Sequence, residues 1–257
     1  MGLASNAADV TGNASDGPVR GQARAPSRSA SEDVVQYLER VIFGGTKEPG
    51  DSLPSEGELA ATLGLSRLTV REGMQALQAR GLVEVSHGRR PAVAHPNATP
   101  LSSFFSASVR RDPSGLLELL EVRLAIEVHT AQLAATHATR SDLSSLEMAL
   151  ESMRRSAGNE HEFNDSDMHF HTAVASASGN RMLSFLVEAM EDPLQDSRVQ
   201  SIRGYRRRSP NVDNLINEHV EIFKGISERN PRAAAASMRR HLIQTRNDLR
   251  AAFSLPD

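Results

Sequence analysis

The sequence predicts a mainly helical protein built in two parts, a small one that ends in a β-hairpin and a larger one made of helices alone. Between positions 31 and 96, helical repeats alternate with turn signals and end in a stretch of alternating apolar residues. From Leu101 onward, apolar residues recur at helical spacing and no stretch shows convincing strand alternation. The first part therefore indicates a compact module with a hairpin, and the second an all-helical bundle.

Composition limits the classes of function. The 257-residue chain is long enough for two modest domains, and its net charge of −3 requires any DNA contact to come from a local patch. Because cysteine is absent, a disulfide is excluded and a metal site must use nitrogen and oxygen ligands. The sequence has no apolar run that could span a bilayer and no secretory signal pattern, so we expect a cytoplasmic protein with no membrane partner.

Changes in composition suggest where the parts begin and end. Residues 1–30 are rich in Ala, Ser, Gly and Asn, with almost no large apolar side chains, so we expect a disordered tail. The smaller part is expected over residues 31–96 and the larger over residues 97–257, with the proline-bearing stretch "HPNATP" as the linker. In the larger part, the helix of "DPSGLLELLEVRLAIE" is expected to start with Asp112 as its cap.

The smaller part has the element order of a winged helix-turn-helix. Apolar residues in "SEDVVQYLERVIFGG" predict a first helix that ends at two glycines. "SEGELAATLG" opens with a capping box formed by Ser55 and Glu58, and "SRLTVREGMQALQARG" follows with Ser66 as its N-cap. Alternation in "LVEV" and an apolar stretch after "HGRR" predict the hairpin that forms the wing.

The third helix carries the residues expected to contact DNA. A helix-turn-helix places the N-terminal half of its second helix in the major groove. If Val70, Met74 and Leu77 face the core, Arg67 and Arg71 lie four residues apart on the opposite face. Arginine can hold guanine through two hydrogen bonds. Two such arginines could also merely solvate a helix, but the complete element order favours DNA binding.

Hydroxyl groups and the wing tip complete the predicted interface. Ser66 and Thr69 lie at the helix end nearest the DNA, where hydroxyls suit phosphate. Arg89 and Arg90 follow Gly88 at the turn, which lets the wing approach a DNA backbone or minor groove closely. We therefore expect double-stranded DNA as a partner.

A second constellation centres on "DMHFH", residues 167–171. Asp167 and His171 are four residues apart and share a helix face, whereas His169 points elsewhere. His219 and His241 fall within the apolar faces of two further helices. Each histidine alone is more often a satisfied core residue, but a metal would satisfy all four polar side chains together. The set suits a divalent transition metal, with zinc expected first and nickel, manganese or iron as alternatives.

Two other classes of protein could use such a site. A catalytic metal needs a general acid or base beside an open position, and the sequence has no HExxH motif, nucleophile elbow or phosphate-binding glycine loop. A nucleoid scaffold would not need the buried polar set. We therefore expect a regulator that is not an enzyme, with a metal-dependent enzyme or a regulator with a metal-free cavity as the alternatives.

Arg123 has two possible roles. It lies on a helix whose Leu119, Leu120 and Leu124 are expected to pack inward. An arginine at the edge of such a face either pairs with Glu127, four residues on, or holds an anion. The residues favour neither role over the other.

The smaller part resembles a known family. The stretch "LPSEGELAATLGLSRLTVREGMQALQARGLVEVSHGRRPAVA" resembles the winged-helix domain of the GntR superfamily of bacterial transcription regulators, over about residues 31–94. The resemblance implies contacts to bases or phosphates from the third helix and from the wing. These residues are Ser66, Arg67, Thr69, Arg71, His87, Gly88 and Arg89. Where the family usually has an arginine, this chain has Gly57, which removes an expected contact.

The larger part is similar to the all-helical ligand-binding domain of the FadR subfamily, called the FCD domain. The similarity lies in "LLELLEVRLAIE", "DMHFHTAVASASGN", "NEHVEIFKGI" and "ASMRRHL" and covers about residues 101–253. It implies metal ligation by Asp167, His171, His219 and His241, and an effector carboxylate on Arg123. It also implies a homodimer formed by the helical domains. Together these features predict a repressor that a small organic or sugar acid releases from operator DNA.

Overall fold

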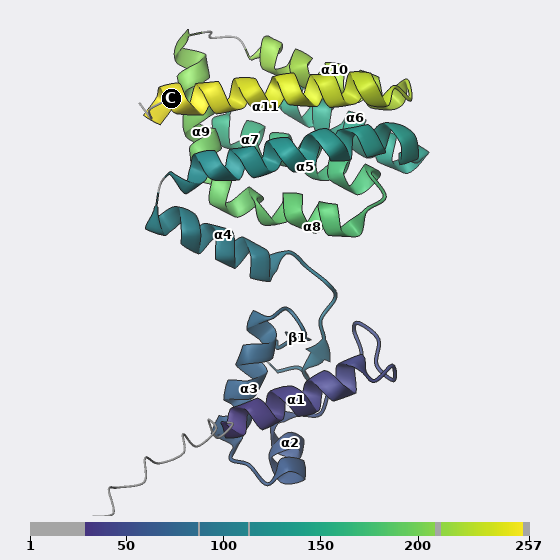
Figure 1. Ribbon diagram of the computed structural model, residues 1–257, viewed down its shortest axis with the longest axis vertical. Coiled ribbons are helices and arrows are strands. Elements are labelled where there is room, and N and C mark those ends of the chain that lie inside the picture. The colour runs from purple at the N-terminus through teal and green to yellow at the C-terminus, as the bar shows by residue number, and fades with distance from the viewer. Residues whose placement is uncertain (1–28, 87, 113, 209–211, 254–257) are drawn as a thin grey trace, which may run out of the picture.

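The computed structural model describes residues 29–86, 88–112, 114–208 and 212–253 (Figure 1). These residues form helices and a single two-stranded hairpin, which confirms the predicted mainly helical fold class. Residues 1–28 of the expected tail lie outside the described residues, whereas Ser29 caps the first helix and Ala30 begins it. Within the described ranges, no helix is long and apolar enough to cross a membrane.

The smaller part has the predicted element order. Its elements are α1 (Ala30–Phe43), α2 (Glu56–Leu63), α3 (Arg67–Ala79), β1 (Val83–Glu84) and β2 (Ala92–Val93). The capping box of Ser55 and Glu58 forms as expected, and the Ser66 side chain accepts a hydrogen bond from the amide of Thr69. The polar caps fix the start of each helix of the motif, and so the angle at which α3 is presented.

An apolar core holds these elements together. Its fully buried members include Leu38, Leu59, Val70 and Leu77, which come from all three helices. The antiparallel strands place Val83 opposite Val93, and both side chains are buried in the same core. The opposite face of α3 takes no part in this core, and its side chains are exposed to solvent.

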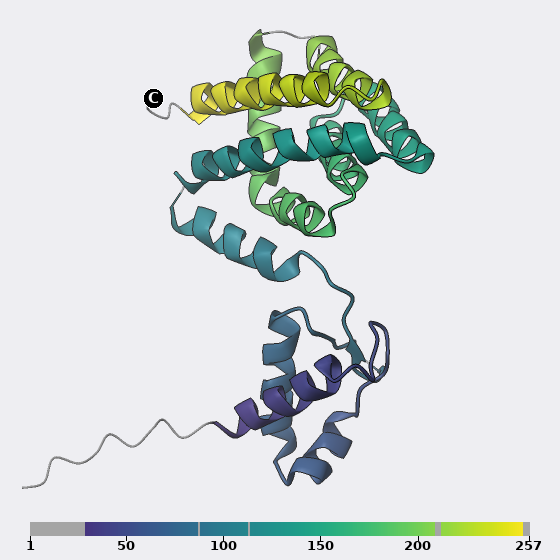
Figure 2. The ribbon, with the colours of Figure 1, turned by 45° about the vertical axis from the view of Figure 1, so that its right-hand side comes forward.

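The larger part is a helical bundle. Its helices are α4 (Thr99–Arg111), α5 (Gly115–His137), α6 (Arg140–Arg155), α7 (Glu160–Ala177), α8 (Arg181–Ala189), α9 (Glu191–Arg208), α10 (Asp213–Ser227) and α11 (Pro231–Phe253). In Figures 1 and 2, α5 and α11 run side by side, and α4 lies at the side of the bundle that faces the smaller part. Helices α5, α7, α10 and α11 surround the centre described below.

The predicted cap of α5 is wrong. The helix begins at Gly115, and Asp112 instead directly follows the last residue of α4. The Asp112 carboxylate accepts a hydrogen bond from the amide of Ser114 at 2.9 Å, which makes a local turn between the helices. Asp serves turns and N-caps through the same side-chain-to-amide bond, so the residue type did not distinguish the two.

Candidate metal centre and DNA-reading surface

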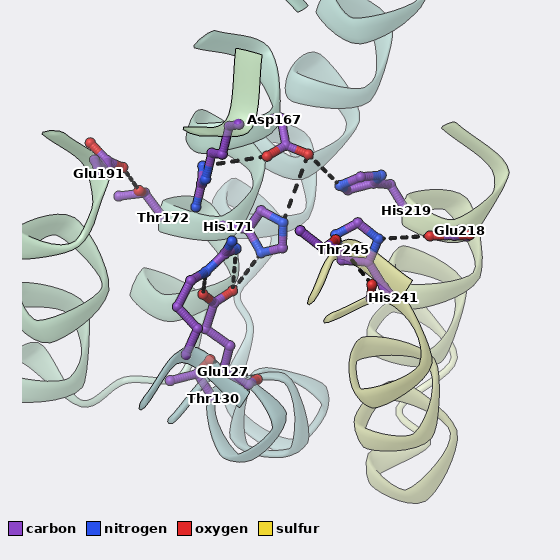
Figure 3. A network of polar contacts seen from close by, with 12 residues as sticks. Glu127, Thr130, Asp167, His171, Thr172, Glu191, Glu218, His219, His241 and Thr245 are labelled. Carbon is purple, nitrogen blue, oxygen red and sulfur yellow. Dashed lines mark hydrogen bonds and ion pairs between the residues drawn. The ribbon is translucent and has the colours of Figure 1, made fainter. Parts of the chain in front are cut away.

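The structure brings together the four side chains that the sequence predicts as metal ligands. Asp167 and His171 come from α7, His219 from α10 and His241 from α11 (Figure 3). One nitrogen or oxygen of each lies within 4.8 Å of those of the others. Asp167 Oδ1 is 3.0 Å from His219 Nε2 and 3.9 Å from His171 Nε2. His169 is exposed, as its place on the helix predicts.

The second ring nitrogen of each histidine, Nδ1, contacts an oxygen. His219 Nδ1 is hydrogen-bonded to the Leu215 carbonyl (2.8 Å) and His241 Nδ1 to Glu218 Oε2 (2.8 Å). His171 Nδ1 lies 2.5 Å from Glu127 Oε2 but is not aligned as a hydrogen bond. An acceptor at Nδ1 favours the proton there and leaves the Nε2 lone pair free, which is the usual arrangement around a metal-binding histidine. The surroundings of the three rings therefore suit ligation through Nε2.

The donor set fits a divalent cation. Among the described residues, Nε2 of His171 and Nε2 of His219 are buried without a hydrogen-bond partner. A buried polar atom without a partner costs free energy, and a cation between the rings would remove that cost. One carboxylate and three imidazoles match the preferences of zinc and its neighbours. These four residues could hold a metal.

Burial sets the protonation states that a metal requires. It lowers the pKa of His171 to about 3 and holds the pKa of His241 well below its usual range. Burial alone would raise the pKa of Asp167, but the close contact with the His219 ring and nearby positive charge keep it well below its ordinary value. At neutral pH the His171 and His241 rings are thus neutral and the Asp167 carboxylate is ionised. These groups can therefore bind a cation without first losing a proton.

Arg123 is fully buried and forms the ion pair that was one of its two expected roles. Its Nε donates to Glu127 Oε1, and its Nη2 donates to Glu127 Oε2 at 3.3 Å. Burial alone would raise the pKa of Glu127, but the charge of Arg123 and the contact with His171 hold it below its usual value. Arg123 also lines a cavity of about 40 Å³ beside the centre.

A second buried arginine was missed by the sequence analysis. Arg198 on α9 is 7% exposed and lines the same cavity, with Nη1 3.4 Å from Asp167 Oδ2. Burial lowers its pKa to about 10, so it is still a cation at neutral pH. The signal was its spacing, since buried Leu194 and Ile202 lie four residues before and after it. That stripe is easily overlooked in a helix as polar as "EDPLQDSRVQSIRGYRRR".

The face of α3 away from the core carries the predicted arginines. Arg67 and Arg71 are exposed, whereas Val70 and Met74 are buried. The Arg71 guanidinium donates two hydrogen bonds to Glu56 on α2, at 3.1 and 2.8 Å. Ser66 is exposed and Thr69 partly so, and their hydroxyls lie 2.9 Å apart at the start of α3.

Gly57 changes the surroundings of this face. A Cβ atom at Gly57 would lie 3.4 Å from Nη2 of Arg67. The guanidinium of Arg67 therefore lies against the space that a side chain at this position of α2 would enter.

The wing carries further positive charge. Gly88 has a φ of 74°, a left-handed conformation that glycine adopts without strain, and both Gly88 and Arg89 are exposed. Arg90 is held by Glu58, with 2.7 Å between Nη2 and Oε1. The predicted contact at His87 lies outside the described residues.

The fold and these side chains are those of a DNA-binding transcription regulator, in which a winged helix-turn-helix is followed by an all-helical domain. Residues 30–93 match the family of bacterial regulatory proteins called the gntR family, and residues 118–244 match the FCD domain. The chain belongs to the GntR family and carries an FCD domain.

Curated relatives cover most of the chain. The Glc operon transcriptional activator of Escherichia coli (strain K12) is 31% identical over 231 residues, which are 86% of this chain and 89% of that protein. The HTH-type transcriptional repressor NanR of Klebsiella aerogenes is 32% identical and covers 84% of this chain and 83% of its own. The HTH-type transcriptional regulator LutR of Bacillus subtilis is 31% identical, with 83% and 98% covered. These relatives are regulators, as expected, and not enzymes.

A solved structure supports the same fold. The Streptococcus agalactiae GntR structure superposes with a TM-score of 0.63 at 26% identity, over 84% of this chain and 99% of that one. The chain therefore shares its overall fold with that GntR structure.

Proposed function

We propose that this protein is a homodimeric transcriptional repressor that binds a divalent transition metal, with zinc expected first, and is released from its operator by a small carboxylate. The observation that carries the proposal is the set of buried, unpartnered imidazole nitrogens beside an ionised Asp167. The metal ligands would be Asp167, His171, His219 and His241, and the bound cation would supply positive charge for the carboxylate.

The DNA-binding role is assigned to residues 31–96, and effector binding and dimerisation to residues 97–257. In this proposal α3 enters the major groove, and the base and phosphate contacts come from its N-terminal half and from the wing. The residues are Ser66, Arg67, Thr69, Arg71, His87, Gly88 and Arg89. The exposure of both α3 arginines supports this assignment.

Regulation requires two states with different affinity for the effector. A ligand shifts the balance between DNA-bound and released forms only if it binds one form more tightly. A two-fold dimer would present two recognition helices to the two halves of a pseudo-palindromic operator. A change in their separation on effector binding would then weaken DNA binding.

Metal content tests the proposal directly. Untagged wild-type protein, His219→Ala and His169→Ala would be compared by elemental analysis after purification and after incubation with zinc, nickel and manganese. We expect about one metal ion per chain in the wild type and in His169→Ala, and loss of the metal in His219→Ala. His169→Ala is the matched control because His169 is an exposed histidine on the metal-bearing helix.

Two results would contradict the metal site. The first is a wild-type protein that takes up none of the three metals. The second is a His219→Ala variant that retains the metal at the wild-type level. Either result would return the histidines to core packing or direct effector contacts and would leave the DNA-binding class unchanged.

A further inference from the structure

The two buried arginines at the cavity differ in how many of their donors are used. Arg123 donates through both Nε and Nη2 to Glu127, and that carboxylate also contacts His171 Nδ1. Among the described residues, Arg198 has a single long contact, 3.4 Å from its Nη1 to Asp167 Oδ2, and its Nε is buried without a hydrogen-bond partner. A guanidinium has five donors, and of the two arginines Arg198 has the weaker contact with a counter-charge and a buried Nε without a partner among the described residues.

The contact that Arg198 does make is with a proposed metal ligand. A cation at the centre would bind the Asp167 carboxylate. It would therefore compete with Arg198 for the negative charge of that carboxylate. A buried guanidinium that loses its counter-charge carries a large desolvation cost. Metal binding would therefore increase the tendency of Arg198 to take up a new anion.

We propose that Arg198 is the residue that binds the carboxylate of the effector, and that Arg123 does not touch it. Arg123 is instead a positioning residue that holds Glu127 against His171 and so orients a metal ligand. This inference rests on the proposed function, because it requires a carboxylate effector beside a metal.

The remaining lining of the cavity indicates the kind of acid. Tyr205, Thr245 and Asp248 supply polar groups and Ile202 and Leu215 supply apolar ones. The hydroxyls of Tyr205 and Thr245 and the carboxylate of Asp248 would suit hydrogen bonds with a hydroxyl group on the ligand. A volume of about 40 Å³ holds only a few water-sized groups, which favours a short hydroxy acid over a sugar acid.

The test separates carboxylate binding from metal binding in the full-length chain. Zinc affinity would be measured by competition with a chromogenic chelator. Binding of glycolate and lactate to zinc-loaded protein would be measured by calorimetry, with glycolamide and lactamide as uncharged controls. The variants are Arg198→Gln, Arg198→Lys and Arg123→Gln.

The two arginines should give opposite results. For Arg198→Gln we expect carboxylate affinity to fall by about tenfold or more, because charge-assisted hydrogen bonds are lost. Its zinc affinity should be equal to or tighter than that of the wild type, because a competing cation is gone. Arg198→Lys should bind the acid with intermediate affinity, since it keeps the charge but loses the fork of donors.

Arg123→Gln should weaken zinc binding by about 10- to 100-fold, as other changes behind a metal ligand do. Once saturated with zinc, this variant should bind the acid nearly as well as the wild type. If it does not fold, the Arg198 variants decide the question alone, because retained zinc affinity shows that the centre of those variants is intact.

The outcomes distinguish this inference from the proposed function. Arg198→Gln protein that binds the acid as tightly as the wild type would overturn the inference and leave the proposed function standing. The inference would also fail if Arg123→Gln lost the acid while keeping its zinc affinity. If zinc-loaded wild type bound neither acid, the inference would fail in its ligand class, and the proposed function, which names only a small carboxylate, would stand.

Discussion

Two arginine–glutamate pairs, one in each part of the molecule, use the same chemistry in opposite surroundings. Arg71 and Glu56 pair on the exposed surface of the winged-helix part, with side chains 56% and 30% exposed. Arg123 and Glu127 pair inside the helical bundle, with side chains 2% and 1% exposed. An exposed pair contributes little to stability and its arginine can exchange partners, whereas a buried pair cannot open without stranding a charge.

The comparison shows that burial decides which arginines are available to a ligand. Glu56 can hold Arg71 in place on the surface, from where the guanidinium could turn to a DNA base or phosphate. Arg123 lies beside the cavity, but Glu127 has already taken two of its donors. Proximity to a site therefore says less about ligand binding than the number of donors that remain free.

The largest expected effect comes from breaking the buried pair. Glu127→Gln would leave the Arg123 cation without a counter-charge, and we expect the free energy of unfolding to fall by about 3–5 kcal/mol. Urea unfolding of metal-free protein, followed by circular dichroism, measures it. Glu56→Gln is the matched control and should leave the urea midpoint near that of the wild type. A Glu127→Gln midpoint equal to that of the control would refute this contrast.

Acid should destabilise the bundle through His171. Burial lowers its pKa to about 3 from an ordinary value of 6.5, so between these values the unfolded chain binds a proton that the folded chain does not. Stability is therefore lost as the pH falls below 6.5. The loss from His171 is about 2 kcal/mol at pH 5, since one pH unit corresponds to about 1.4 kcal/mol per proton. His241, whose pKa burial also holds well below its usual range, adds to the loss in the same window. Asp167 and Glu127, whose pKa values are also lowered, add to the loss at still lower pH.

This pH dependence can be measured on metal-free protein by urea unfolding at intervals from pH 7.5 to 5. Replacing His171 with Gln should make the slope below pH 6.5 shallower, and the part that remains is expected from His241. The same replacement at exposed His169 should leave the slope as it is in the wild type. Equal slopes in the wild type and in His171→Gln would show that His171 is not the group responsible.

The features that the sequence predicted well depend on local rules or on strong contrasts. The capping box of Ser55 and Glu58 needs only the residues within one helical turn. The gathering of His219 and His241 with "DMHFH" was predictable because a histidine within an apolar helix face contrasts with its neighbours. The start of α5 was not, since Asp112 can make the same side-chain bond in a turn as in a helix cap.

The roles of the buried arginines depend on distances that the sequence does not contain. For Arg123 the spacing to Glu127 allowed an ion pair, but only the packing of α5 against α7 shows that the pair is buried and contacts His171. Arg198 meets Asp167 across 31 residues of sequence. Local periodicity can place Arg198 on the apolar stripe of α9, but it gives no information about which residue Arg198 meets across such a separation.

The smallest effect is expected at the exposed pair, and it separates the two partners. Arg71→Ala should lower affinity for a selected operator duplex by about tenfold, because one arginine contact to a base is lost. Glu56→Gln should change it far less, since Glu56 only holds the side chain that the DNA would take over. Fluorescence anisotropy at one fixed salt concentration measures both, with a scrambled duplex as the control.

If Arg71→Ala bound the operator as tightly as the wild type, the face of α3 assigned to DNA would be wrong. If Glu56→Gln lost as much affinity as Arg71→Ala, Arg71 would need its ion pair with Glu56 in order to bind DNA. The exposed pair would then be as unable to exchange partners as the buried pair of Arg123 and Glu127.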